Sequence, residues 1–262
     1  EDLEVRDPDP QELLDFVAQM EFRTLSKRLA DKLGVQAPVI AEPEVQQAVI
    51  EAAAAAAFDT SNYETIRDAA ALQTWIDRIY ARGYVAVDTE TTGLNEMRAD
   101  LVGVSLCVQA GEAAYLPLAH RAGQSDDLFG TDALAEGQMD LDTALAMLKP
   151  MLEDSTILKI GQNMKYDAKI LARVGIQVAP IDDTMLMSYA QNGGLHNHGM
   201  DLLSERYLDH APISIKTLLG SGKSAITFDR VPIDEASLYA AEDADITLRL
   251  WQYLKLRLHL NR

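Results

Sequence analysis

The stretch Tyr84–Leu94, YVAVDTETTGL, decides the fold. Its first four residues are an apolar, β-prone run, and the Thr-Gly pair at 92–93 is a turn signal. We therefore predict a buried strand that ends in a turn, with Asp88 and Glu90 at its exit. Residues two apart on a strand point to the same face, so these carboxylates would lie side by side. They repel each other unless a cation neutralises them or one keeps its proton.

The carboxylate pair has two interpretations. One is an ordinary acidic exit from a strand into a turn, without a chemical role. The other is a site for a hard divalent cation such as Mg²⁺ or Mn²⁺, because these ions prefer oxygen ligands. The remainder of the chain has to distinguish between them.

The length of 262 residues fits one large domain or a domain with an appendage, and the hydrophobic fraction of 48% is enough for a sizeable core. No apolar run approaches the roughly 18 residues of a membrane span, so we expect no membrane partner. The single cysteine, Cys107, excludes an intrachain disulfide and favours a reducing, cytoplasmic location. The chain starts at Glu1 without a signal-peptide pattern, and we interpret it as a piece of a longer protein.

The charge balance restricts the function. Lys and Arg number 23 and Asp and Glu number 41, a formal net charge of −18. A protein that grips duplex nucleic acid by its phosphates normally has a basic face. This chain must avoid nucleic acid, hold it through metal ions and a few local contacts, or borrow a basic surface from a neighbouring domain.

Two regions are expected along the chain. Residues 1–63 are predicted to be an N-terminal helical segment and linker, with one helix after Pro10 and a second at Leu25–Leu33. The linker, from 35 to 65, contains a run of alanines and is expected to be partly helical. Residues 64–262 are predicted to form the main domain.

The main domain is predicted to have an α/β fold. Four strands are expected, at Tyr84–Asp88, Leu101–Val108, Glu112–Pro117 and Thr156–Ile160. The short loops between the first three predict an antiparallel meander. Helices are expected at Ile66–Arg82, Asp142–Lys149, Tyr166–Val174, Thr184–Gln191, Met200–Leu208 and Glu235–Arg257. This order of elements indicates a mixed β-sheet flanked by helices.

A second group of candidate site residues is Gly161–Asp167, GQNMKYD, directly after a predicted strand. Asn163 is a good N-cap, so a helix would begin near Met164 with Asp167 one turn inside it. The carboxylate of Asp167 would then aim back over the strand ends. The alternative is a capped amphipathic helix without a chemical role.

A third group is Tyr239–Asp243, YAAED, in the last predicted helix. Tyr239 and Asp243 are four residues apart and share one helix face. A phenol one turn from a carboxylate can orient a water molecule that a metal on the carboxylate activates. The alternative is a packed tyrosine beside an ordinary helix charge. Glu242 and Asp245 lie on other faces, and we expect both to be solvated.

The motifs DTETTGL, GQNMKYD and YAAEDAD, in this order, resemble the three exonuclease motifs of the DEDD superfamily. The closest resemblance is to the 3′-5′ exonuclease (proofreading) domain of bacterial DNA polymerase I, a family A polymerase. The tyrosine in YxxxD indicates the tyrosine-type branch. The resemblance covers Glu64–Leu258 and implies an RNase H-like fold, in which three antiparallel strands and further parallel strands form a mixed sheet flanked by helices.

The resemblance also implies roles for ten residues. As catalytic residues and metal ligands it implies Asp88, Glu90, Asp167 and Asp243, with Tyr239 orienting the attacking water. Asp88, Glu90 and Asp243 would hold the tighter of two divalent ions (Mg²⁺ or Mn²⁺). Asp167 would hold the second ion, to which Asp88 would also bridge. The positions expected near the substrate are Leu94, Gln162, Asn163, Tyr166 and Phe228. Leu94 and Phe228 match positions that pack against terminal bases, with ordinary core packing as the alternative.

The implied function is hydrolysis of single-stranded or frayed DNA 3′ ends to nucleoside 5′-monophosphates. Two metal ions about 3.5–4 Å apart can activate the water, stabilise the leaving oxygen and neutralise the phosphoryl charge. The implied partners are a single-stranded DNA 3′ end and a covalently linked polymerase domain. An exoribonuclease of the same superfamily and a catalytically inert structural domain are the alternatives. His196 and His198 raise zinc as a further alternative, but two nearby histidines without further ligands are a weak signal.

Overall fold

The computed structural model describes residues 9–20, 22–35, 58–122 and 133–260. Contacts within the chain divide it into two compact units, Glu1–Val49 and Ile50–Arg262. Most of the predicted linker, 36–57, lies outside the described residues, and so does its expected helix. In the ranges that are described, no helix is long and apolar enough to cross a membrane.

The first unit contains two helices at the places that the sequence predicts. α1 (Pro10–Gln19) is capped by Asp9, whose carboxylate accepts two backbone N–H hydrogen bonds from the first turn (2.8 and 3.1 Å). α2 (Arg23–Leu33) ends at Gly34, whose φ of 68° is the left-handed conformation that glycine adopts at helix ends. The two helices contact each other.

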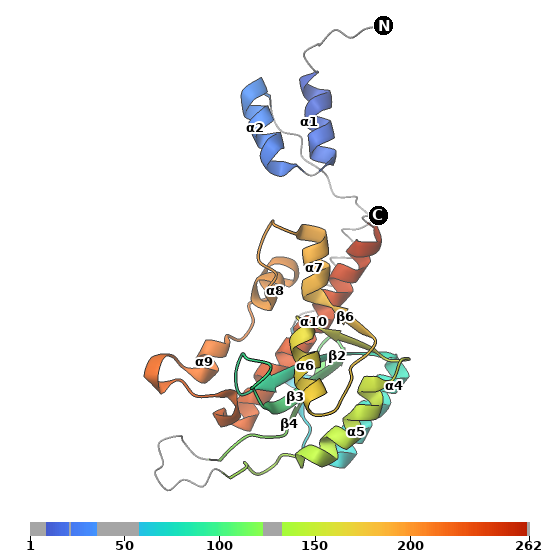
Figure 1. Ribbon diagram of the computed structural model, residues 1–262, viewed down its shortest axis with the longest axis vertical. Helices are drawn as coiled ribbons and strands as arrows, with labels where there is room; N and C mark the ends of the chain where they lie inside the picture. Colours follow the sequence, from blue (N-terminus) through green and yellow to red (C-terminus); the bar gives the residue numbers. More distant parts are fainter. Residues whose placement is uncertain (1–8, 21, 36–57, 123–132, 261–262) are drawn as a thin grey trace. The chain divides into compact units, whose positions relative to one another are not determined.

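The second unit is built on a six-stranded sheet with the order β1-β4-β3-β2-β5-β6 (Figure 1). The strands are β1 (Glu64–Thr65), β2 (Tyr84–Thr91), β3 (Leu101–Gln109), β4 (Glu112–Pro117), β5 (Leu158–Gly161) and β6 (Ile181–Asp183). β2, β3 and β4 form the predicted antiparallel meander. The pairs β2–β5, β5–β6 and β1–β4 are parallel. The prediction of a mixed sheet flanked by helices is therefore confirmed.

β2 is longer than predicted, which changes the place of the acidic pair. The strand runs past Asp88 to Thr91, because β3 pairs with it along this length, with Asp88 opposite Ser105 and Glu90 opposite Gly103. A register shift between Glu90 and Thr91 ends the regular pairing. Both carboxylates thus belong to a paired central strand rather than to its exit.

The two faces of the sheet are covered by different helices. Side chains on one face, including Val85 and Val87, pack in one cluster with α4 (Ala69–Arg82) and α5 (Leu141–Glu153). These two helices lie side by side in Figure 1. On the other face, Ala86 packs against α10 (Ile233–Leu260). Because strand residues alternate between faces, Asp88 and Glu90 share the α10 face with Ala86.

Shorter elements complete the second unit. They are η1 (Thr60–Asn62), α6 (Lys165–Arg173), α7 (Thr184–Asn192), α8 (Met200–Leu208), α9 (Ile215–Leu219), η2 (Gly222–Ser224) and η3 (Phe228–Arg230). α6, α7 and α8 correspond to predicted helices, whereas α9, the 3₁₀ turns, β1 and β6 were not predicted.

The expectation that Glu242 and Asp245 are solvated is wrong, since both are buried. Glu242 contacts the His210 ring (2.9 Å) and accepts a backbone N–H hydrogen bond (2.7 Å). Asp245 accepts hydrogen bonds from Tyr63 Oη (2.8 Å) and Arg249 Nε (2.9 Å). α10 is covered on several sides, so these two carboxylates are satisfied by Arg249 on the same helix and by partners distant in sequence.

Candidate metal and nuclease site

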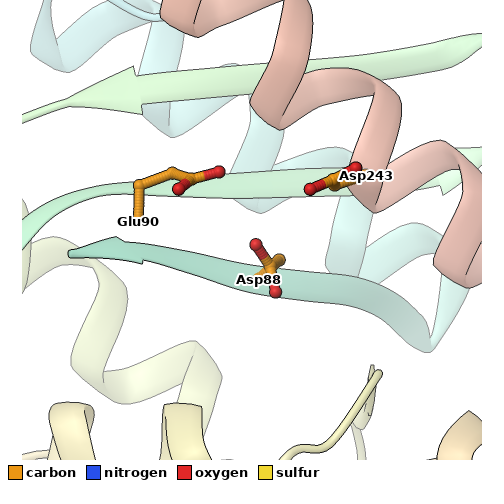
Figure 2. A group of neighbouring side chains, drawn as sticks. All are labelled: Asp88, Glu90 and Asp243. Atoms are coloured by element: carbon orange, nitrogen blue, oxygen red, sulfur yellow. The ribbon is translucent and has the colours of Figure 1, made fainter. Parts of the chain in front are cut away.

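An acidic cluster forms where β2 faces α10. Asp88 and Glu90 from the strand and Asp243 from the helix each place one carboxylate oxygen within 4.8 Å of the others. Figure 2 shows the three side chains converging on one space between the two elements. The cluster joins residues about 150 positions apart in the chain, and it is the only group of this kind found among the described residues.

Burial and mutual repulsion make ionisation of the cluster unfavourable. Burial, followed by the charges of Asp167, Glu90 and Asp243, raises the pKa of Asp88 well above its ordinary value. Burial and the charges of Asp243 and Asp167 do the same to the pKa of Glu90. The pKa of Asp243 is raised to about 8, mainly by burial, although a hydrogen bond from Tyr239 opposes the rise. A cation would relieve this repulsion.

Asp167, the fourth predicted carboxylate, lies beside the cluster in the first turn of α6. Its Oδ1 accepts hydrogen bonds from the backbone N–H (3.1 Å) and the hydroxyl (2.5 Å) of Thr89. Burial raises the pKa of Asp167 to about 7, although both hydrogen bonds lower it. Thr89 stands between Asp88 and Glu90 in β2, so the strand that supplies two carboxylates also orients the fourth.

The predicted side-chain cap of α6, the helix that carries Asp167, is not formed. Asn163 does not cap α6 with its side chain; it adopts a left-handed φ of 63° ahead of the helix. Asp183, at the end of β6, accepts hydrogen bonds from the backbone N–H groups of Asn163 (3.1 Å) and Met164 (3.0 Å) instead. The same carboxylate caps α7 by accepting from Met185 N (2.9 Å). Asp183 therefore caps α7 locally and also holds the turn before α6 from 20 residues away, and local sequence rules do not detect the second contact.

Tyr239 lies one turn before Asp243 on α10, and its hydroxyl is hydrogen-bonded to that carboxylate. Burial, then the charges of Asp243 and Glu90, raise the pKa of the phenol, so Tyr239 keeps its proton. Its ring centroid lies 5.9 Å from that of Phe228. Tyr239 thus presents a polar tip to the acidic cluster and an apolar ring to the wall next to it.

All ten predicted site residues line one cavity of about 480 Å³. They are Asp88, Glu90, Leu94, Gln162, Asn163, Tyr166, Asp167, Phe228, Tyr239 and Asp243. The two predicted base-contacting residues differ in exposure: Leu94 is 95% exposed, whereas Phe228 is only 3% exposed. Core packing therefore describes most of the surface of Phe228, and Leu94 projects from the turn after β2.

The sequence did not indicate another part of the cavity wall. This part consists of Ile215 and Leu219 from α9 and of Ile226 and Thr227 before η3. α9 has five residues and is followed by Gly220, so it is too short to show a helical period. Only the tertiary fold brings this apolar wall opposite the carboxylates.

Two predicted substrate contacts already have protein partners. Gln162 donates from Nε2 to the His198 carbonyl (2.8 Å), and its Oε1 accepts a hydrogen bond from Thr184. Tyr166 donates from its hydroxyl to the Gly93 carbonyl (2.6 Å). Gln162 thereby holds the segment containing His198, and Tyr166 holds the turn before Leu94.

His196 and His198, which flank Asn197, also contact protein groups. The His196 ring lies 3.1 Å from Tyr207 Oη, and His198 Nδ1 lies 2.9 Å from Ser188 Oγ. The ring centroids of the two histidines are 4.9 Å apart. These contacts fasten the segment before α8 to α7 and to α8 itself.

The domain has an α/β fold similar to that of RNase D. RNase D from Escherichia coli aligns with a TM-score of 0.56 at 20% identity, over 76% of this chain and 46% of that chain. NrnC from Brucella melitensis with bound Mg²⁺ aligns with a TM-score of 0.51 at 24% identity, over 76% of this chain and 82% of that one. At these identities the likeness establishes the fold.

Sequence relatives establish the family. Residues 63–259 match the 3′-5′ exonuclease family. DNA polymerase I from Rhizobium leguminosarum is 49% identical over 82% of this chain and 22% of its own length. DNA polymerase I from Pseudomonas aeruginosa is 41% identical over 74% of this chain and 20% of its own length. The chain belongs to the 3′-5′ exonuclease family, in the form found in DNA polymerase I, which confirms the resemblance.

The chain spans only about a fifth of the length of these curated relatives.

Proposed function

We propose that this domain is a metal-dependent 3′-5′ exodeoxyribonuclease that releases nucleoside 5′-monophosphates from single-stranded or frayed DNA 3′ ends. The observation that carries the proposal is the convergence of Asp88, Glu90 and Asp243 in one cavity. Tyr239 and Asp167 border the same space. An acidic cavity without a metal would repel a phosphodiester, whereas with divalent ions it can bind and hydrolyse one.

The donor set fits divalent metal ions. Oε1 of Glu90 is buried without a hydrogen-bond partner, and an oxygen in this state suits a hard cation. Asp88, Glu90 and Asp243 would hold one Mg²⁺ or Mn²⁺ ion, and Asp88 with Asp167 would hold a second. Such ions, when bound, supply an activated water and neutralise charge on the phosphoryl group and the leaving 3′ oxygen.

The protein's own groups orient the reaction. The Tyr239 hydroxyl, held against Asp243, is placed to accept or donate a hydrogen bond to the attacking water. Leu94 and Phe228 offer apolar surfaces on the cavity for the terminal bases, since both line it. Asn163 Oδ1 is buried without a partner at the same cavity, so it is available to the terminal nucleotide.

The cellular role that we propose is the proofreading module of a DNA polymerase I in the cytoplasm, with a covalently linked polymerase domain. Support comes from the family match and from the two polymerase relatives. Editing requires the 3′ end to travel between two sites, so the role depends on the linked polymerase domain.

An exoribonuclease is the second candidate, favoured by the RNase D fold.

The test is to incubate 3′- and 5′-labelled single strands of DNA and RNA with the domain in Mg²⁺, Mn²⁺ or EDTA. We expect stepwise loss of nucleotides from the DNA 3′ end with either metal and none in EDTA. Asp243→Asn is the matched control, because it removes one ligand charge at nearly constant volume. RNA cleaved faster than DNA would favour the second candidate, and metal-independent cleavage would contradict the proposal.

A further inference from the structure

His120 is a buried ionisable residue outside the acidic cluster, and both of its ring nitrogens have partners. Nδ1 lies 2.9 Å from the Val231 carbonyl and Nε2 lies 2.8 Å from Tyr115 Oη. Its backbone is also fixed: its N–H donates to Gln138 Oε1 (2.9 Å), and its carbonyl accepts from Gln138 Nε2 (2.8 Å). The residue follows β4 and joins that strand to the segment before α10.

The hydrogen-bond partners determine the tautomer of His120. A carbonyl oxygen can only accept, so Nδ1 must carry a proton. Burial lowers the pKa of the ring, which favours the neutral form. In a neutral ring Nε2 is then an acceptor, and Tyr115 must donate to it. The two hydrogen bonds form a chain: the Tyr115 hydroxyl donates to Nε2, and the Nδ1–H donates to the Val231 carbonyl.

The Tyr115 end of this hydrogen-bond chain lies on the same face of the sheet as the acidic cluster. Tyr115 in β4 is opposite Ser105 in β3, which is in turn opposite Asp88 in β2. The phenol of Tyr115 extends over Gly103, the partner of Glu90; a Cβ at position 103 would lie 2.2 Å from Tyr115 Oη. Gly103 therefore makes room for Tyr115 on the face of the sheet that carries the two carboxylates.

The other end lies at the apolar cavity wall. Val231 closes η3 by donating its N–H to the Phe228 carbonyl (3.0 Å). The Phe228 ring centroid is 5.9 Å from the His120 ring and 5.9 Å from the Tyr239 ring. The next residue along the strand exit, Arg121, donates its N–H to the Asp229 carbonyl (2.8 Å). The β4 exit and η3 are thus joined at two consecutive residues.

We propose that His120 is a positioning residue for the nuclease site: its bond to Val231 sets η3, and with it Phe228 and the start of α10, against the sheet that carries Asp88 and Glu90. His120 touches neither the substrate nor the metal ligands. This inference rests on the proposed function, since the placement of Phe228 matters only if a terminal base packs there. The residue would act on binding of the 3′ end.

Two isosteric replacements separate the two bonds. The amide of His120→Asn can place a donor near the position of Nδ1, so it retains the bond to Val231 and loses the bond to Tyr115. The longer side chain of His120→Gln reaches instead toward the position of Nε2 and loses the bond to Val231. Tyr115→Phe removes only the hydroxyl and leaves the Val231 bond intact. Ile79→Val, on α4 at the opposite face of the sheet, controls for a general loss of stability.

We expect His120→Gln to lower kcat/KM on single-stranded DNA by on the order of 10- to 100-fold, mostly through KM, as for a small misplacement of a binding group. His120→Asn and Tyr115→Phe should retain the wild-type KM even if their urea midpoints fall. Mg²⁺ affinity, measured by calorimetry, should be unchanged in all of them. Equal KM values for the Gln and Asn variants, or a loss that merely follows the unfolded fraction, would overturn the inference.

Affinity for a 3′-terminal strand in Ca²⁺, measured by fluorescence anisotropy, gives a readout that does not need hydrolysis. Weaker binding by His120→Gln alone supports the inference, and equal binding by all variants contradicts it. If the wild-type domain binds the strand but cleaves nothing in Mg²⁺, the proposed function fails while the comparison of affinities still decides the role of His120.

Discussion

The Tyr239 side chain has a hydroxyl in a polar, acidic environment and a ring in an apolar one, and this determines how the hydroxyl can take part in the reaction. The phenol is bonded to Asp243, whereas its ring faces Phe228 across the cavity wall. Its pKa is raised by burial and by nearby carboxylates, so it acts as a neutral hydrogen-bonding group and not as a base. A group of this kind orients a water without taking its proton.

Tyr239→Phe should therefore reduce kcat without affecting metal binding. We expect a loss of about 10²-fold, the lower end of the range for groups that assist proton transfer, while Asp243→Asn should lose nearly all activity. Tyr80→Phe, an exposed tyrosine on α4, is the control. Rates are measured on labelled single strands at saturating substrate. A Tyr239→Phe enzyme as inactive as Asp243→Asn would show that the phenol has a larger role than orientation.

The raised pKa values of Asp167, about 7, and of Asp243, about 8, also affect stability. A carboxyl group whose pKa is higher in the folded state stabilises the fold below its unfolded pKa, near 4, and loses this contribution as the pH rises through the folded value. In EDTA, Asp243→Asn should thus have a higher Tm than wild type, with a difference that grows from pH 5 to pH 9. Saturating Mg²⁺ should reverse the order at pH 8. A pH-independent difference in EDTA would contradict this account.

At the scale of elements, the meander and the long helices could be predicted because their apolar patterns extend over many residues. β1 and β6 have two and three residues and show no such pattern. The caps were predicted less well than the helices, since Asp183 lies some 20 residues from the helix start that Asn163 was expected to cap. Sequence rules detect a cap only when it is local.

The Asp183 carboxylate links the start of α7 to the turn before α6. Asp183→Ala removes the N-cap of α7 and the acceptor for two backbone N–H groups in that turn, so it should lower the free energy of unfolding by about 2 kcal/mol, near 1 kcal/mol for the lost cap and about as much for the turn. It should also lower kcat, because α6 carries Asp167. Urea unfolding and single-strand hydrolysis measure the two effects.

Asp140→Ala is the matched control for this experiment. Asp140 is an exposed N-cap of α5 that accepts a hydrogen bond from Thr143 N (2.9 Å), remote from the acidic cluster in sequence and on the opposite face of the sheet. Its loss should reduce stability by about 1 kcal/mol and leave kcat unchanged. Full activity in folded Asp183→Ala would mean that Thr89 alone suffices to orient Asp167.

At the scale of the whole molecule, three short motifs in order were enough to nominate nine of the ten predicted site residues that line a single cavity; the tenth, Phe228, lies outside the motifs. They were recognisable because each keeps its carboxylate at a fixed spacing. The residues that the motifs omit, Ile215, Leu219 and Ile226, contribute only apolar surface. Many apolar residues can form such a wall, so no particular sequence is required there.

The net charge of −18 determines how such a site can select its substrate. Four carboxylates in an acidic chain cannot attract duplex DNA by counterion release, so affinity must come from bound metal ions and from the terminal bases. Opening a paired end to supply about three unpaired nucleotides breaks about three stacked steps at roughly 1.4 kcal/mol each, near 4 kcal/mol. That free energy corresponds to a factor on the order of 10³.

We therefore predict that the isolated domain degrades single strands fastest, mismatched ends more slowly and fully paired blunt ends slowest. Mismatched ends fall between because they are already partly frayed. In a full-length polymerase, a neighbouring domain that holds the duplex would offset part of the melting free energy, so the preference should be stronger for this domain alone. Initial rates at subsaturating concentrations of strands with one sequence give the ratios, and equal rates on blunt duplex and single strand would refute the prediction.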